Sequence, residues 1–403
     1  MIEQAEEKHN LERDMSDKSD IGRRLQEEVL APMRRTFVGK DEVIDLLGLS
    51  LVAGENLFIL GPPGTAKSAL VQDLGTRLHG RTFEYLLTRF TEPNELFGPF
   101  DIRKLREGVL ETNTEGMLPE ASIAFLDELL NANSAILNSL LSVLNERVFR
   151  RGREAVKLPL LMSVGASNHL PEDEALRALF DRFLLRVRSD NVSGDQLGAV
   201  LTQGWEREGR QARSELSQSS EAGLSIEEIR TLNRSLPEVN LSPIQEDYLN
   251  LVDRLRKAGL PLSDRRAVKL QRPVAASALL CGRSSACVSD LWVFRHVWDL
   301  EEQEEVLCGI VDEVIGRKDE TTPVDQTHPQ AEINSAPDPE ALGRDLDAIS
   351  SSLEGDSGEA ARAVARDKLA ALRERLQWVQ NPTAREHLND RVTQLWPMVD
   401  ESE

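Results

Sequence analysis

The sequence predicts an α/β protein, in which short apolar strands alternate with helices, followed by a helical C-terminal part. The apolar run Leu57–Leu60 leads into a glycine-rich loop, and a helical pattern leaves that loop from Ala69. Further apolar runs of strand length recur at 82–87, 122–126 and 160–168, while several helical segments follow residue 226. Alternating strands and helices of this kind are typical of an α/β protein.

Composition is that of an ordinary soluble protein. The 403 residues suffice for two or three domains, with 40% hydrophobic and 29% charged residues. No apolar run approaches the ~18 residues of a membrane span, and the polar N-terminus is unlike a signal peptide, so we expect a cytoplasmic protein. Cys281, Cys287 and Cys308 lack paired spacing, which favours buried thiols over a metal site or disulfides.

The net charge of −21 argues against a nucleic-acid backbone as the main partner. Non-specific binding to DNA or RNA depends on exposed Lys and Arg side chains that neutralise phosphates. A local basic channel remains an alternative to simple solvated charges. Its residues would be Arg147, Arg150, Arg151 and Arg153, in a predicted hairpin at 147–158.

The loop after the first strand has the pattern of a phosphate-binding loop. Its eight residues fill every fixed position of G-x-x-x-x-G-K-[ST]: Gly61, Pro62, Pro63, Gly64, Thr65, Ala66, Lys67 and Ser68. The glycines let backbone N–H groups face polyphosphate oxygens, Lys67 reaches the outer phosphates, and Ser68 places a hydroxyl on Mg²⁺ at a helix N-terminus. The alternative is a chance Gly/Pro turn between a strand and a helix.

Two helices are expected before this loop, from Ile21 and from Val43, separated by a turn at Val38 and Gly39. A helical lead-in of this kind commonly packs beside the nucleotide base. We therefore predict that Val38 and Gly39 contact adenine, with a plain interhelical turn as the alternative.

A second nucleotide motif follows about sixty residues later, where the apolar strand 122–126 ends in Asp127 and Glu128. Asp127 would hold Mg²⁺ through water, and Glu128 would orient and polarise the attacking water. A buried strand that merely ends in solvated carboxylates is the alternative.

Asn168 ends the next apolar strand, at 160–168. Its short polar side chain could touch both the γ-phosphate and the attacking water. We predict this sensing role because Asn168 follows the carboxylate strand in the order that such a site needs. The alternative is an asparagine that only caps the following turn.

The order of the motifs GPPGTAKS, IAFLDE, ASN and ALFDRF resembles the MoxR branch of the AAA+ ATPases. The stretch FEYLLTRF, the insertion that begins ELFGP, and LNSLL with NER are most similar to the RavA subgroup. The resemblance covers about residues 22–300. It implies a parallel β-sheet flanked by helices and followed by a small helical lid, with a helix-two insert near 95–116 and a pre-sensor hairpin at 147–157.

The resemblance also implies rings of six subunits with ATP at each subunit junction. Arg182 matches the arginine finger that reaches the neighbouring nucleotide, although a surface ion pair with Asp181 or Asp173 is the alternative. Arg265 matches sensor two of the lid, with Arg266 as the second choice. Relatives often work with a von Willebrand factor A-domain (vWA) protein, which is therefore the predicted partner.

The predicted domains follow from these motifs and from composition. They are a flexible arm at 1–20, a nucleotide-binding core at 21–190, a connection and helical lid at 191–315, a linker at 316–340, and a helical C-terminal appendage at 341–403. In the appendage, apolar residues recur at helical spacing, and we expect a helical hairpin or three helices.

Together these features predict an ATP-hydrolysing ring that remodels or matures a partner protein, with ATP and Mg²⁺ as cofactors. Two alternatives stay open. A nucleic-acid motor would show hydrolysis stimulated by DNA or RNA, and a nucleotide-gated scaffold would assemble with little hydrolysis. Glu128, Asn168 and Arg182 argue against the scaffold.

Overall fold

The structure is a computed structural model. It describes residues 20–106, 111–151, 154–171, 173–212, 224–260, 262–316 and 327–331, and in the C-terminal part 342–343, 346–347, 349–350, 365–366, 369, 372–373, 376 and 382–400. The chain divides into two compact units, Met1–Ala331 and Glu332–Glu403. Of the predicted arm at 1–20, all but residue 20 lies outside the described residues.

The first unit is built on a five-stranded parallel sheet with the strand order β2-β3-β6-β1-β7. The strands are β1 (Leu57–Leu60), β2 (Thr82–Leu86), β3 (Ile123–Asp127), β6 (Met162–Ser167) and β7 (Leu185–Arg188). The phosphate-loop strand β1 pairs with β6 on one side and β7 on the other. The predicted α/β fold with a parallel sheet is therefore confirmed. The sequence did not predict β7.

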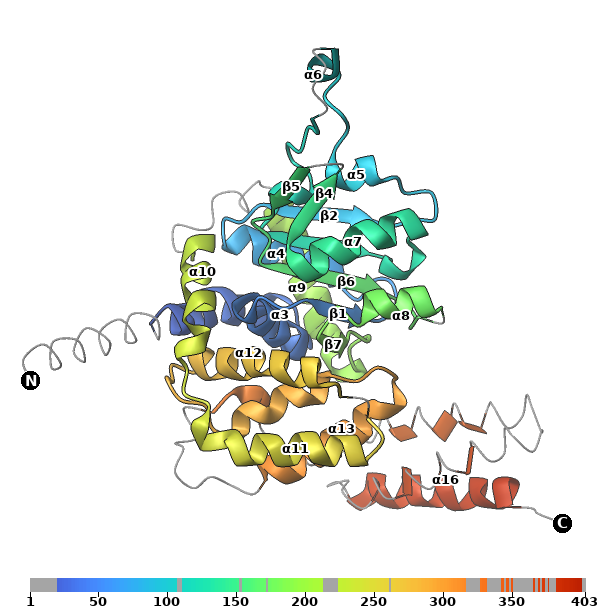
Figure 1. The fold of residues 1–403 in the computed structure, drawn as a ribbon. Helices are drawn as coiled ribbons and strands as arrows, with labels where there is room; N and C mark the ends of the chain where they lie inside the picture. The colour runs from blue at the N-terminus through green and yellow to red at the C-terminus, as the bar shows by residue number, and fades with distance from the viewer. Residues whose placement is uncertain are drawn as a thin grey trace, which may run out of the picture. The chain divides into compact units, whose positions relative to one another are not determined.

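Helices flank this sheet (Figure 1). They are α2 (Ala31–Thr36), α3 (Asp41–Ala53), α4 (Lys67–Arg77), α7 (Ser134–Glu146), α8 (Glu174–Phe180) and α9 (Gly194–Ala212), with a π-helical stretch at Leu25–Leu30. The predicted insertion holds the short helices α5 (Pro93–Phe97) and α6 (Ile102–Arg106), and α6 projects from the top of the core in Figure 1. The predicted hairpin is present as the antiparallel strands β4 (Val148–Arg151) and β5 (Glu154–Lys157).

A helical lid follows the sheet, as predicted. It contains α10 (Ile226–Ser235), α11 (Gln245–Lys257), α12 (Asp264–Leu280), a 3-10 segment at Val288–His296 and α13 (Glu302–Ile315). The sequence predicts one helix over 289–305, and this prediction is wrong. The chain leaves the 3-10 segment after His296, and α13 begins only at Glu302.

The break before α13 has a physical reason, because Asp299 is used to join the lid to the sheet. Its carboxylate pairs with Arg186 of β7 at 2.8 Å and with Arg266 of α12 at 2.9 Å. Arg186 is fully buried and also donates to the carbonyl of Trp298 at 2.6 Å. Burial and the nearby Arg266 lower the pKa of Arg186 to about 9. Two buried guanidinium groups therefore converge on one carboxylate between lid and core.

Residues 327–331, inside the predicted linker, pack against this junction as a strap. His328 is fully buried and stacks on Trp292 with ring centroids 4.6 Å apart. Gln330 donates to Asp45 of α3 at 2.7 Å, and its carbonyl accepts from Arg295. This strap ends the first unit and ties core and lid together.

We expect the strap to make stability fall in acid through His328. Burial lowers the pKa of His328 to about 3, so the folded protein keeps this ring neutral while the unfolded chain binds a proton below about pH 6.5. The contribution of the neutral His328 ring to the free energy of unfolding is complete above pH 6.5 and is lost as the pH falls toward 3. At pH 5 the loss is about 2 kcal/mol.

The measurement is the free energy of unfolding at pH 7 and pH 5 for the parent and for His328→Asn. Asparagine keeps an acceptor for the Gln330 N–H, which donates to the His328 ring at 3.2 Å, but it does not titrate. The variant is needed for comparison because Glu304 has the opposite effect on the free energy of unfolding. Burial raises the pKa of Glu304 to about 7, so its protonation stabilises the folded protein as the pH falls. An equal pH response of both proteins would contradict the prediction.

The second unit has an apolar core of its own. Its one fully described helix is α16 (Pro382–Asp400), and the described residues before it that carry a helical assignment include 342–343 and 365–366. The buried residues are those of the predicted helical stripes: Leu342, Leu346, Ile349, Ala365, Leu369, Leu372, Leu376, Leu388, Val392 and Leu395.

Candidate nucleotide-binding site

The phosphate loop leaves the carboxyl end of β1 and is held between the ends of its two neighbouring strands. Gly61 donates its N–H to Ser167 at the end of β6, and Ser189 after β7 donates to Leu60. A Cβ at Gly61 would lie 2.3 Å from the carbonyl oxygen of Ser189, so only glycine fits there. Gly64 has a φ of 86° and faces open space, which leaves its backbone accessible to a ligand.

Lys67 begins α4 directly after this loop, and its side chain is buried. Its ammonium group donates to the carbonyls of Gly61 and Pro62, both at 2.8 Å. Burial lowers the pKa of Lys67, and the carboxylates of Asp127 and Glu128 partly offset that shift. A buried ammonium at a helix N-terminus and beside two carboxylates suits a metal-bound phosphate chain. Ser68, on the same turn, is half-buried.

Asp127 is the last residue of β3, and Glu128 follows it with a φ of 50°. This left-handed backbone conformation is uncommon for residues other than glycine. It turns the chain away from the strand directly after Asp127, so the two carboxylates follow one another at this turn. Glu128 donates its N–H to its neighbour's Oδ1 at 3.0 Å. Asn131 donates from Nδ2 to Glu128 Oε2 at 3.3 Å. Asn131 therefore positions Glu128, a role that no motif of the sequence indicated.

Asn168 follows β6, between β3 and β1 in the sheet, and its side chain is exposed. Its Oδ1 lies 2.5 Å from Nδ1 of His169. Because the carboxyl ends of parallel strands share one edge, Asn168 lies on the same edge as the phosphate loop and Glu128. The sheet therefore brings together the three motifs that the sequence separated.

Val38 and Gly39 form the turn between α2 and α3, with Gly39 at a φ of 70°. The next residue, Lys40, is buried and donates to the carbonyl of Asp190. Burial lowers the pKa of Lys40, and the positive charge of Lys67 lowers it further. The carboxylate of Asp190 offsets part of this shift. Lys40 is a second basic residue near the phosphate loop, and the sequence did not predict it.

The two predicted arginines lie elsewhere, at the amino edge of the sheet. Asn56, just before β1, donates to the backbone carbonyls of Arg182 at 2.9 Å and Leu144 at 3.3 Å. The phosphate loop starts at the other end of β1, roughly 16 Å away at the rise of a strand. Arg182 is paired with Asp181 at 2.7 Å, which is the alternative contact that the sequence offered.

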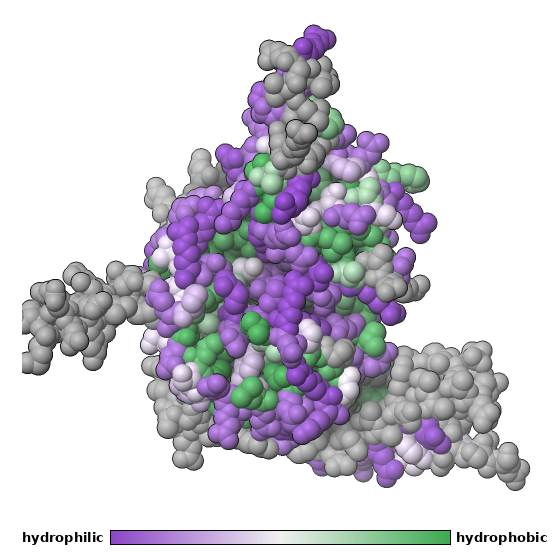
Figure 2. Space-filling view, viewed as in Figure 1, coloured by the Kyte–Doolittle hydropathy of each residue, from purple (hydrophilic) through white to green (hydrophobic). Residues whose placement is uncertain are grey.

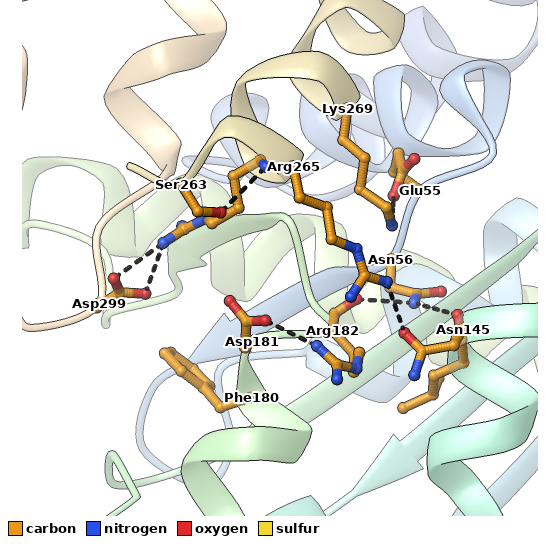
Figure 3. Close-up of polar contacts among 12 residues, drawn as sticks. Glu55, Asn56, Asn145, Phe180, Asp181, Arg182, Ser263, Arg265, Lys269 and Asp299 are labelled. Carbon is orange, nitrogen blue, oxygen red and sulfur yellow. Dashed lines mark hydrogen bonds and ion pairs between the residues drawn. The ribbon is translucent and has the colours of Figure 1, made fainter. Parts of the chain in front are cut away.

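Arg265 joins Arg182 at this edge. It is exposed on the first turn of α12 and donates to Asn145, at the end of α7, at 3.4 Å. Figure 3 shows the Arg265 side chain reaching from the lid toward Arg182 and Asn145. Arg266 points away, into the junction, where it binds Asp299 and the carbonyl of Val297. Of the two sensor-two choices, Arg265 is the one whose side chain is exposed.

The hairpin does not supply the alternative basic channel in the form predicted. Arg147 is turned inward and donates to the carbonyls of Gly54 and Leu161 at 3.3 and 3.2 Å. Burial lowers its pKa to about 10. Arg150 is paired with Glu146, and Arg153 lies outside the described residues.

In the part of the chain that the structure describes, no helix is both long and apolar enough to span a membrane.

Two known protein families match this chain. A family described as the MoxR domain in MoxR-vWA-beta-propeller ternary systems matches residues 23–234, more than half of the chain. A second family, described as an AAA lid domain, matches residues 243–311.

Individual relatives span the same region. An uncharacterized protein of Methanocaldococcus jannaschii is 34% identical over 282 residues, which cover 70% of this chain and 73% of that protein. Chaperone MoxR1 of Mycobacterium tuberculosis is 27% identical over 180 residues, 43% of this chain and 47% of that protein. The crystal structure of a candidate ATPase from Cytophaga hutchinsonii has a TM-score of 0.59 and 18% identity over 76% of this chain and 98% of that one, which supports the fold alone.

The family match includes the phosphate loop, the carboxylate strand and Asn168, and the lid match includes Arg265. The sheet order and the two family matches thus agree on the fold. The chain belongs to the MoxR family of AAA+ ATPases.

Proposed function

We propose that this protein hydrolyses ATP in a ring of identical subunits and uses the energy to remodel or mature a partner protein. In this proposal the loop Gly61–Ser68 binds the phosphates and the turn at Val38 and Gly39 contacts adenine. Ser68 and Asp127 hold Mg²⁺. Glu128 polarises the attacking water, and Asn168 contacts that water and the γ-phosphate.

One observation carries the proposal: the predicted catalytic groups are divided between opposite edges of the sheet. The phosphate loop and Glu128 lie at the carboxyl edge, whereas Arg182 and Arg265 lie together at the amino edge. In this arrangement the two arginines lie away from the phosphate loop of their own subunit. A neighbouring copy, packed head to tail, can supply them.

The chemistry explains why such a division is useful. Phosphoryl transfer spreads negative charge over the γ-oxygens, and a guanidinium group stabilises that charge well because it is planar and always protonated. If the arginines arrive only from the next subunit, hydrolysis depends on assembly. The Asp181 carboxylate that now pairs with Arg182 would release it to the phosphate.

We propose a vWA-domain protein as the partner, on the basis of the ternary systems named in the matching family. The RavA-like subgroup, the six-fold ring, the cytoplasmic location and the five domain boundaries stay predictions from the sequence. The acidic net charge of −21 continues to favour a protein over a nucleic acid as the substrate.

The first test is the ATPase rate per subunit against protein concentration, with the molecular mass measured with and without ATP. We expect the rate to rise as a ring forms and to ignore added single- or double-stranded DNA. A DNA-dependent rate would favour the nucleic-acid motor. Assembly without hydrolysis would favour the scaffold, and a monomer with full activity would contradict the composite site.

A further inference from the structure

Helix α9 presents its apolar face to solvent. Leu197, Leu201 and Trp205 recur every four residues, so they lie along one side of the helix. Their exposed fractions are 49%, 66% and 80%. Gly194 and Gly198 lie beside them, and a Cβ on either would meet nothing within 4 Å. We call this side, Leu197, Leu201 and Trp205, the α9 stripe.

A neighbouring side of α9 is turned to the protein and carries both apolar and polar residues. Val200, Gln203 and Arg207 are half-buried there, and the Arg207 guanidinium lies 5.0 Å from the ring centroid of Phe37. An amphipathic helix on a soluble protein normally buries its apolar side. Here three large apolar side chains face solvent instead, which indicates that the α9 stripe is a contact surface.

The lid carries a groove of about 720 Å³, lined by both apolar and polar side chains, between its first turns and the helices α11 and α12. Leu249 of α11 and Val268 of α12 line it and are 62% and 65% exposed, with Tyr248 and Val252 deeper. Figure 2 shows hydrophobic residues among polar ones over the lower part of this face, where Figure 1 places α11 and α12. We call this feature the lid groove.

Each of these two surfaces adjoins one half of the divided site. The α9 stripe is on the helix that packs against the adenine turn, where Gln196 and Val192 approach Gly39. The lid groove is lined by Asp264 and Val268 of α12, the helix that also carries Arg265. A contact between the stripe of one copy and the groove of the next would therefore join the nucleotide side to the arginine side.

The apolar area of the α9 stripe is consistent with a contact between subunits that is stable only when nucleotide is bound. Trp205 alone offers roughly 150 Å² and the two leucines roughly 60 Å² each. This is about a third of the ~800 Å² per partner in a stable interface, so the remainder has to come from the site itself.

We propose that the α9 stripe of one subunit seats in the lid groove of the next copy of this chain. This inference rests on the proposed function, because it supplies the docking contact of the head-to-tail ring. This contact fixes the relative position of the two subunits and so brings Arg182 and Arg265 to the neighbouring phosphate loop.

The contact can be tested by cross-linking two variants that each add one cysteine, Trp205→Cys and Val268→Cys, mixed with a short bis-maleimide. The native cysteines interfere little, because Cys287 is buried and burial raises the pKa of the Cys281 and Cys308 thiols to about 12. We expect a covalent dimer that is at least tenfold more abundant with ATP. The control mixture is Trp205→Cys with Val306→Cys, since Val306 of α13 is 46% exposed outside both surfaces.

Assembly provides the second measurement. Leu201→Glu and Val268→Glu should each weaken ATP-dependent assembly at least tenfold, while Val306→Glu should not. If the parent forms no ring with ATP, the proposed function and this inference both fail. If the parent forms a ring but the cysteine pair does not cross-link, or Leu201→Glu assembles as the parent does, only this inference is overturned. A stripe occupied by another protein would give that second result.

Discussion

Lys67→Ala is expected to lose nucleotide binding, whereas Glu128→Gln is expected to bind ATP and to hydrolyse it at least a hundredfold more slowly. Lys67 is a buried cation at the start of α4, so its removal takes the positive charge from the place where the phosphates would lie. Glutamine at 128 keeps the size and the hydrogen bond of the side chain with Asn131 but cannot polarise water as a carboxylate does.

Binding would be measured by titration with a fluorescent ATP analogue, and hydrolysis by phosphate release over the same protein concentrations. Lys257→Ala is the matched control, because this lysine lies on the lid surface, where it pairs with Asp253 on its own helix. Wild-type hydrolysis by Glu128→Gln would remove Glu128 from the catalytic role. Undiminished binding by Lys67→Ala would contradict the assignment of the loop.

Arg182→Ala and Arg265→Ala are each expected to keep most of their ATP binding and to lose hydrolysis, with about a thousandfold loss for Arg182. Both side chains lie at the edge opposite the loop, so their loss leaves the subunit's own nucleotide contacts intact. The decisive measurement mixes Arg182→Ala with Glu128→Gln. Neither protein is active alone, but random pairing in a head-to-tail ring makes about one junction in four complete.

Recovery of activity on mixing would therefore demonstrate a site shared between subunits, and its absence would count against one. Arg266→Ala is the matched control for Arg265→Ala. Arg266 is buried and bound to Asp299, so its loss should lower the free energy of unfolding by about 3 kcal/mol. Replacement of the exposed Arg265 should leave that free energy nearly unchanged, which chemical denaturation can measure.

Much of the core could be predicted from the sequence because its signals are local. The phosphate loop needs fixed residue types at fixed spacing, and apolar strands that end in polar groups identify themselves. The strand β7 escaped prediction because Arg186 interrupts its apolar run. This arginine is buried only because Asp299, more than a hundred residues later, neutralises it. The prediction of one helix over 289–305 was wrong for the same reason, because Asp299 lies between the 3-10 segment and α13.

The sequence by itself determined the α/β class, the phosphate loop, the carboxylate pair after β3 and the position of Asn168 at a strand end. Only the tertiary structure decided that Arg182 and Arg265 share one edge, that Arg266 belongs to the junction, that 327–331 is a strap, and that α9 turns its apolar face outward. The physical reason is the range of the interactions. Loops and strands follow from neighbouring residues, whereas the direction a side chain faces depends on contacts between segments far apart in the chain.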